Sequence, residues 1–109
     1  MRLARRRKRL RRLIRASDGL DVDAEQWGFV LLALEDAGWK PPRSTLWYIA
    51  TGTEVSHEEA ADLANAADVL FNAPLEAPVW ANSLYSRRLD LNVFYSVAEF
   101  LRGGAFRIG

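Results

Sequence analysis

Residues 56–72, SHEEAADLANAADVLFN, combine a helix-capping signal with small and apolar side chains at helical spacing. Ser56 followed by Glu59 is a capping box, in which each side chain bonds to the backbone N–H of the other residue. The residues that recur at helical spacing behind the box are Ala60, Leu63, Ala64, Ala67, Leu70 and Phe71. This stretch predicts a helix over 57–72 whose alanines allow a neighbouring element to approach closely.

A second helix is predicted over 24–37. Asp23 is a good N-cap with Gln26 three residues later, and Gly38 followed by Trp39 is typical of a Schellman stop. Its predicted core face consists of Trp27, Val30, Leu31 and Leu34.

A third helix is predicted over 91–102, between a cap at Asp90 and a stop at Gly103-Gly104. Its inward residues are expected to be Val93, Phe94, Val97, Phe100 and Leu101.

Two short strands are predicted. TLWYIAT at 45–51 is rich in aromatic and β-branched residues and ends at Gly52, and AFRI at 105–108 alternates apolar and polar side chains. We expect these two strands to pair, and residues 73–89, with two prolines, to form a long irregular connection. The predicted fold class is α+β, with about three helices on a small antiparallel sheet of two or three strands.

The charges are strongly segregated along the chain. Residues 2–15 hold nine of the fifteen Lys and Arg side chains and no acid, whereas residues 16–109 hold six basic and fourteen acidic side chains, a net charge of −8. The basic residues of the arm are Arg2, Arg5, Arg6, Arg7, Lys8, Arg9, Arg11, Arg12 and Arg15. We expect residues 1–17 to form a helical or disordered arm, and residues 18–109 to form a single acidic domain.

Composition and motifs argue against catalysis. The chain has no cysteine, and its one histidine, His57, lies in a predicted first helical turn beside Glu58 and Glu59, with Ser56 already used as the cap. Its glycines match no phosphate-binding loop, and its acid pairs lie at helix ends or on helix surfaces. We therefore expect no enzyme activity, no metal and no cofactor.

Location is predicted from the same features. The longest apolar run, residues 27–34, is too short to span a bilayer, and a secretory signal would need an apolar segment behind the basic start. We expect a cytoplasmic protein that does not bind membranes.

Aromatic residues outside the predicted core suggest a protein-binding surface. Trp47 and Tyr48 would point to opposite faces of the strand over 45–51, so one of them is expected to be uncovered. Tyr, Trp and Arg are the residue types that dominate binding hot spots. The candidate protein-binding residues are Trp47, Tyr48, Trp80, Tyr85, Tyr95, Arg102, Glu58, Glu59 and Asp62.

The arm supports an alternative, because dense arginine neutralises phosphates and a basic segment can order in a nucleic-acid groove. The nine basic residues of the arm are the candidates for that role. No recognition module accompanies them, and the −8 domain would repel a phosphate backbone. Other possibilities stay open. The arm could dock on its own acidic domain or on that of a second copy, or it could be absent if translation begins at a codon such as that of Val22.

Three motifs resemble a family of small, uncharacterised bacterial and phage proteins. They are GWKP at 38–41, VSHEEAADLANA at 55–66, and FYSVAEFLRGGAFRI at 94–108. The family shows GW-x-P, VS-x-x-[DE]-A-x-x-L-A and a terminal F-x-R-x-GGF-x-I, and here Ala105 stands between the second glycine and the phenylalanine. The resemblance covers roughly residues 27–108 and omits the arm. In general character such proteins are similar to anti-CRISPR and other phage inhibitors.

Together these features predict a non-enzymatic interaction protein. The expected role is a phage- or mobile-element-encoded inhibitor that binds nucleic-acid-handling machinery through an acidic, aromatic-bearing surface. The alternative is a nucleic-acid-binding protein that uses the arginine-rich arm.

Overall fold

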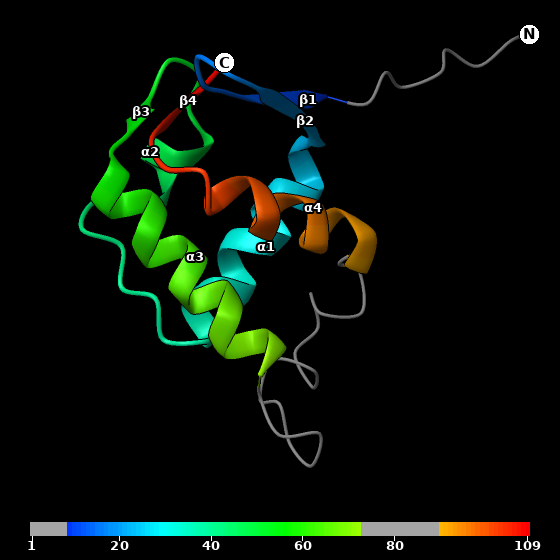
Figure 1. The fold of residues 1–109 in the computed structure, drawn as a ribbon, viewed down its shortest axis with the longest axis vertical. Coiled ribbons are helices and arrows are strands. Elements are labelled where there is room, and N and C mark those ends of the chain that lie inside the picture. Colours follow the sequence, from blue (N-terminus) through cyan, green and yellow to red (C-terminus); the bar gives the residue numbers. More distant parts are fainter. Residues whose placement is uncertain (1–8, 73–89) are drawn as a thin grey trace, which may run out of the picture.

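One antiparallel sheet and a layer of helices make up the fold (Figure 1). The computed structural model describes residues 9–72 and 90–109. Within them, strands β1 (Leu10–Ile14), β2 (Gly19–Asp23), β3 (Glu54–Val55) and β4 (Phe106–Ile108) pair in the order β2-β1-β4-β3. Helices α1 (Ala24–Asp36), α3 (His57–Phe71) and α4 (Leu91–Leu101), with the short α2 (Thr45–Ile49), lie below the sheet in this view. The predicted α+β class is confirmed.

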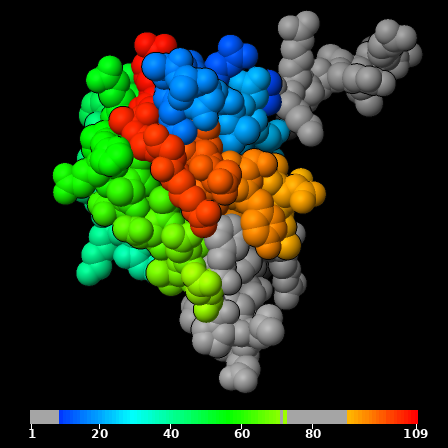
Figure 2. All heavy atoms as spheres, viewed as in Figure 1, coloured from blue at the N-terminus to red at the C-terminus, as the bar shows by residue number. Residues whose placement is uncertain are grey.

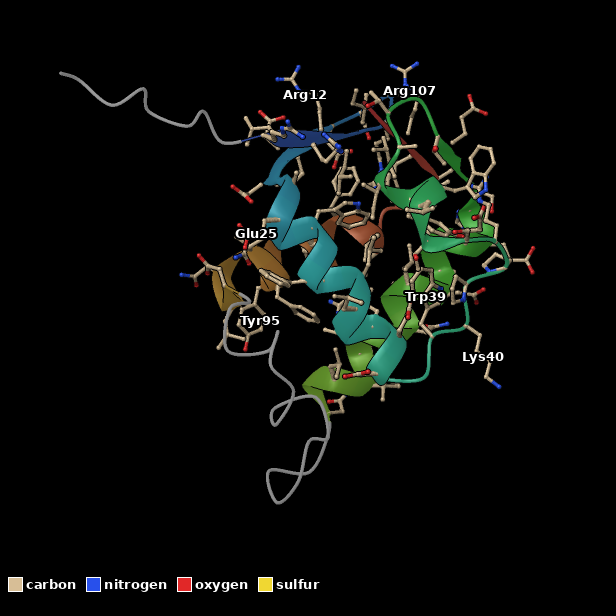
Figure 3. All side chains as sticks on the ribbon, turned by 180° about the vertical axis from the view of Figure 1, so that it is seen from behind. Arg12, Glu25, Trp39, Lys40, Tyr95 and Arg107 are labelled. Atoms are coloured by element: carbon tan, nitrogen blue, oxygen red, sulfur yellow. The ribbon has the colours of Figure 1, made fainter. Side chains whose placement is uncertain are left out.

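The two faces of the sheet differ sharply. Side chains that face the helices are buried, and they belong to Leu13, Val22, Val55, Phe106 and Ile108. Their neighbours along the strands, Arg12, Asp21, Glu54 and Arg107, are exposed. Figure 3 shows Arg12 and Arg107 pointing away from the helices. The period-2 alternation of strands thus puts an apolar layer against the helices and a charged layer in solvent.

The three predicted helices are confirmed together with their caps. The capping box of Ser56 and Glu59 is formed at the start of α3, and Asp23 and Asp90 accept backbone N–H groups at the starts of α1 and α4. α1 ends in a Schellman motif, because Trp39 N–H bonds to Leu34 O and Gly38, with φ 105°, bonds to Glu35 O.

The expectation for the basic arm is wrong for residues 10–14. They form β1, which pairs over five residues with β2 and also pairs with β4 through Leu13–Ile108 and Ile14–Arg107. Figure 2 shows the first described residues packed against the C-terminal ones. The spacing of Leu10, Leu13 and Ile14 fits a helix, but the pairing available on both sides favours the strand. Residues 1–8 lie outside the described ranges.

The strand predicted over 45–51 is also wrong. Thr45–Ile49 form the single-turn helix α2, because Ser44 caps Leu46 N–H and one helical turn brings Tyr48 into the core. β4 therefore pairs with β1 and β3 instead, and the sheet has four strands rather than two or three. The predicted connection over 73–89, with Trp80 and Tyr85, lies outside the described residues.

Candidate protein-binding surface

Helix α2 presents most of its apolar side chains to solvent. Leu46 is 71% exposed, Trp47 56% and Ile49 36%, whereas Tyr48 is fully buried. At 100° per residue, a helix that turns Tyr48 inward must turn Leu46 to the opposite side and Trp47 and Ile49 to the flanks. We call Leu46, Trp47 and Ile49 the α2 platform.

The start of the platform is held by Arg43. Its Nη2 donates to the carbonyl oxygen of Glu54 at 2.6 Å and lies 3.1 Å from the carboxylate of Glu59. Its guanidinium also lies over the ring of Tyr48, 5.3 Å from the ring centroid. One arginine thus ties the segment before α2 to β3 and α3.

Tyr48 anchors the platform from below. Its hydroxyl donates to Glu59 Oε2 at 2.6 Å, Trp27 Nε1 donates to its carbonyl oxygen at 2.7 Å, and Trp39 packs edge-on against its ring at a centroid distance of 5.2 Å. Burial, together with the hydrogen bond to Glu59, raises the pKa of Tyr48 to about 12. The phenol therefore stays a neutral donor over the whole physiological range.

Glu59 is the charged centre of this network. Burial opposes its charged form, but hydrogen bonds from the Tyr48 hydroxyl and from Ser56, and the charge of Arg43, outweigh burial and lower its pKa. Glu59 therefore stays ionised and accepts both from Tyr48 and from its own helix cap.

The end of the platform is held by Arg11 of β1, whose Nε donates to Ile49 O at 2.9 Å. Gly52, with φ 90°, then turns the chain so that its N–H reaches Ile108 O on β4. The exposed apolar side chains thus sit on a backbone that is fixed at both ends. Such preorganisation lowers the entropy lost on binding.

The candidate residues predicted from the sequence divide into different roles. Tyr48 is buried and Glu59 is bonded to it, so these two support the platform from inside and their assignment to a contact surface is corrected. Glu58 and Asp62 are exposed on α3, outside that network. Trp80 and Tyr85 fall within 73–89 and are not described.

The two remaining candidates lie on α4 and at its end. Tyr95 is 58% exposed, and Arg102 pairs with Asp68 at 2.6 Å and with Glu99 at 3.4 Å. Figures 1 and 3 place α2 and the turn of α4 that carries Tyr95 on opposite sides of α1. Trp47 and Tyr95 therefore do not form one patch.

Three arginines of the basic arm are used within the fold. Arg11 holds α2, Arg12 pairs with Asp21 at 2.8 Å across β1 and β2, and Arg15 packs over the ring of Phe100 at 3.8 Å. Arg9 is exposed. Of the nine basic residues proposed for nucleic-acid binding, Arg2, Arg5, Arg6, Arg7 and Lys8 fall outside the described ranges.

His57 is exposed in the first turn of α3 and lines a cavity of about 240 Å³ with Asp68 and Arg102. Asp68, the carboxylate among the lining residues, is already paired with Arg102 and so serves the contact between α3 and α4. Among the described residues, no three His, Asp or Glu side chains are grouped in a way that could hold a metal ion.

Sequence reasoning missed Leu46 and Ile49 as exposed residues. A usable signal was present, because Ser44 is a strong N-cap residue and a helical period over 45–49 puts Tyr48 opposite Leu46.

No protein-family model, curated protein or solved structure matches the chain. Of the helices described, none is long and apolar enough to cross a membrane.

Proposed function

We propose that this chain is a non-enzymatic interaction protein that binds a partner protein through the α2 platform. The observation that carries the proposal is that Leu46, Trp47 and Ile49 stand exposed on a turn whose backbone is bonded at both ends. Tryptophan is the residue type most enriched in binding hot spots, and flanking aliphatic side chains help to exclude water around it.

The partner that we propose is a nucleic-acid-handling protein with a cationic groove. Residues 16–109 carry a net charge of −8, and residues 9–109, which include every described strand, still carry −4; this excess of acid would attract a surface that normally holds a phosphate backbone. The chain would then act as an inhibitor that occupies such a groove, with Trp47 fixing the docked orientation.

The alternative, nucleic-acid binding by the arm, has less support. Arg11, Arg12 and Arg15 make contacts within the fold, so this alternative depends on Arg9 and on the basic residues of 2–8. It predicts an affinity that falls steeply with salt and disappears when residues 1–8 are removed.

The two functions are separated by capture from lysate of the source organism, with and without nuclease treatment. The baits are the full chain, a chain that begins at Arg9, and the Trp47→Ala variant of the full chain. We expect one protein to be held by the first two baits and lost with Trp47→Ala. Capture that depends on residues 1–8 and is removed by nuclease supports the arm instead.

A further inference from the structure

Strand β2 lies at one edge of the described sheet. Within residues 9–72 and 90–109 it pairs with β1 alone. Arg15 N–H bonds to Asp18 O, and Ala24 N–H bonds to Arg9 O, which fixes the alternation of hydrogen-bonded pairs between the two strands. By that alternation, Leu20 and Val22 point their backbone groups toward β1, and Gly19 and Asp21 point theirs toward the open edge.

An apolar groove runs beside this edge. It has a volume of about 190 Å³ and lies between the inner face of β2 and helix α4. Its lining residues are Leu20, Asp21, Val22, Asn92, Val93 and Ser96. This mainly apolar lining suits one aliphatic side chain.

Four carboxylates line the groove or lie within three residues of its lining along the chain; Asp21 pairs with Arg12, and Asp23 and Asp90 cap α1 and α4. Asp21 lines the groove, Asp23 follows on the same strand, and Glu25 lies in the next turn of the chain. Asp90 stands two residues before Asn92, and its backbone N–H donates to Gln26 Oε1 at 2.7 Å, which joins the starts of α1 and α4. Figure 3 shows Glu25 and Tyr95 on the same flank of the molecule.

The pairing of β1 with the other side of β2 indicates which side-chain pattern an added strand would need. There β1 places Arg12 across from Asp21 on the outer face, with a 2.8 Å ion pair, and Leu13 across from Leu20 on the inner face. A strand added to the open edge would meet Asp21 on the same outer face and the groove on the inner face.

We propose that the open edge of β2 and the β2–α4 groove bind an extended basic segment of a partner protein by strand addition. In that segment, basic side chains alternate with aliphatic ones. The aliphatic side chain enters the groove, the basic side chains lie on the outer face beside Asp21, which Arg12 contacts from the other side, and backbone hydrogen bonds form with Gly19 and Asp21. This site is separate from the α2 platform and does not depend on its role.

The test uses the full chain and an acetylated heptapeptide of alternating Lys and Val, KVKVKVK, labelled for fluorescence anisotropy. Two isomers carry three N-methyl groups each, one on the first three Lys residues and the other on the three Val residues, and so have the same composition. In an added strand, only one of these two sets of N–H groups faces β2. We expect one isomer to bind at least about tenfold more weakly than the other, with the Lys isomer weakened if the strands are antiparallel and the Val isomer weakened if they are parallel. If both isomers bind equally well, or if both lose affinity equally, strand addition is ruled out.

Two variants of α4 locate the site. Ser96→Lys places a charged side chain in the groove, and Leu91→Lys adds the same charge at an exposed position that does not line it. Ser96→Lys should weaken KVKVKVK at least about tenfold, whereas Leu91→Lys should change its Kd by less than about threefold. Thermal unfolding confirms that both variants are folded. The proposal is contradicted if the two variants weaken KVKVKVK equally or if the peptide EVEVEVE binds as tightly as KVKVKVK. It is also contradicted if the chain self-associates and a second copy displaces the peptide.

Discussion

Arg15 at the end of β1 lies directly over Phe100 in the last turn of α4, with Cζ 3.8 Å from the ring centroid. Its Nη2 donates to the carbonyl oxygens of Phe100 and Gly104, and its Nη1 lies 3.4 Å from Asp18. The carbonyl groups at a helix C-terminus carry a partial negative charge, which favours a cation there. This arginine of the basic arm therefore joins the first described strand to the last helix.

Replacing Arg15 with Ala should lower the free energy of unfolding by about 2–4 kcal/mol, because it removes charge-assisted hydrogen bonds and a cation–π contact at a site that is only 11% exposed. Arg15→Lys should lose less stability, since lysine keeps the charge but lacks the several N–H donors of the planar guanidinium. Urea unfolding measures both, and Arg9→Ala, at an exposed position, is the control. Equal stability of Arg15→Ala and Arg9→Ala would refute the structural role.

Chains with different starts should differ sharply in stability. A chain that begins at Val22 lacks β1 and the first three residues of β2, so β4 loses one of its two partners. We expect no cooperative thermal transition for this chain in far-UV circular dichroism. A chain that begins at Arg9 keeps every described strand and should melt within a few degrees of the full chain. A cooperative Val22 chain would show that β1 is dispensable.

Tyr48 should ionise later than a tyrosine in water. Its pKa of about 12, raised by burial and by the bond to Glu59, means that the folded state holds this proton more tightly than the unfolded state. The stability that Tyr48 contributes is present at neutral pH and is lost as the pH rises from about 10 to about 12. Absorbance titration of phenolate should show a late step that is missing in Tyr48→Phe. A late step that survives this substitution belongs to another tyrosine.

Glu59 should make the protein sensitive to acid. Because its pKa is lowered in the folded state, its contribution is present at neutral pH and is lost as the pH falls below about 4.3, the ordinary value for glutamate. Glu59→Gln should cost about 1–2 kcal/mol at pH 7 and clearly less at pH 3, by urea unfolding. Glu58→Gln, at the exposed neighbouring position, should cost little at either pH. A Glu59→Gln cost that is the same at both pH values contradicts this role.

The three long helices could be predicted from the sequence because their signals are local. Ser56 with Glu59, Asp23 and Asp90 each cap the helix that follows them through bonds within a few residues. Gly38 ends α1 through a left-handed conformation that glycine adopts at little cost.

The strands and α2 could not be predicted in the same way, since distant pairing decides them. The sequence pattern of residues 10–14 is typical of a charged helix. They form a strand because Arg11 and Arg15 donate to carbonyl groups of α2 and α4 and because Leu13 pairs with β4. The residues at 45–49 favour a strand by composition, but burial of Tyr48 against Trp27 and Trp39 overrides that preference. The same contact explains why one of the two adjacent aromatics, Trp47, is left exposed.

The proposed function depends on binding by the α2 platform. Trp47→Ala should leave the free energy of unfolding within about 0.5 kcal/mol of the parent value, since the side chain is 56% exposed. The same substitution should weaken binding of the captured partner by at least about 2 kcal/mol. Tyr48→Ala, by contrast, should destabilise the fold by about 3–5 kcal/mol, as expected for removing a large buried aromatic side chain.

The most direct measurement is the Kd of the captured partner for the full chain, the chain that begins at Arg9, and the folded Trp47→Ala variant, in the same buffer. We expect the first two Kd values to agree within about twofold and Trp47→Ala to bind at least about thirtyfold more weakly. Unchanged binding by Trp47→Ala, with loss of binding when residues 1–8 are removed, would contradict it.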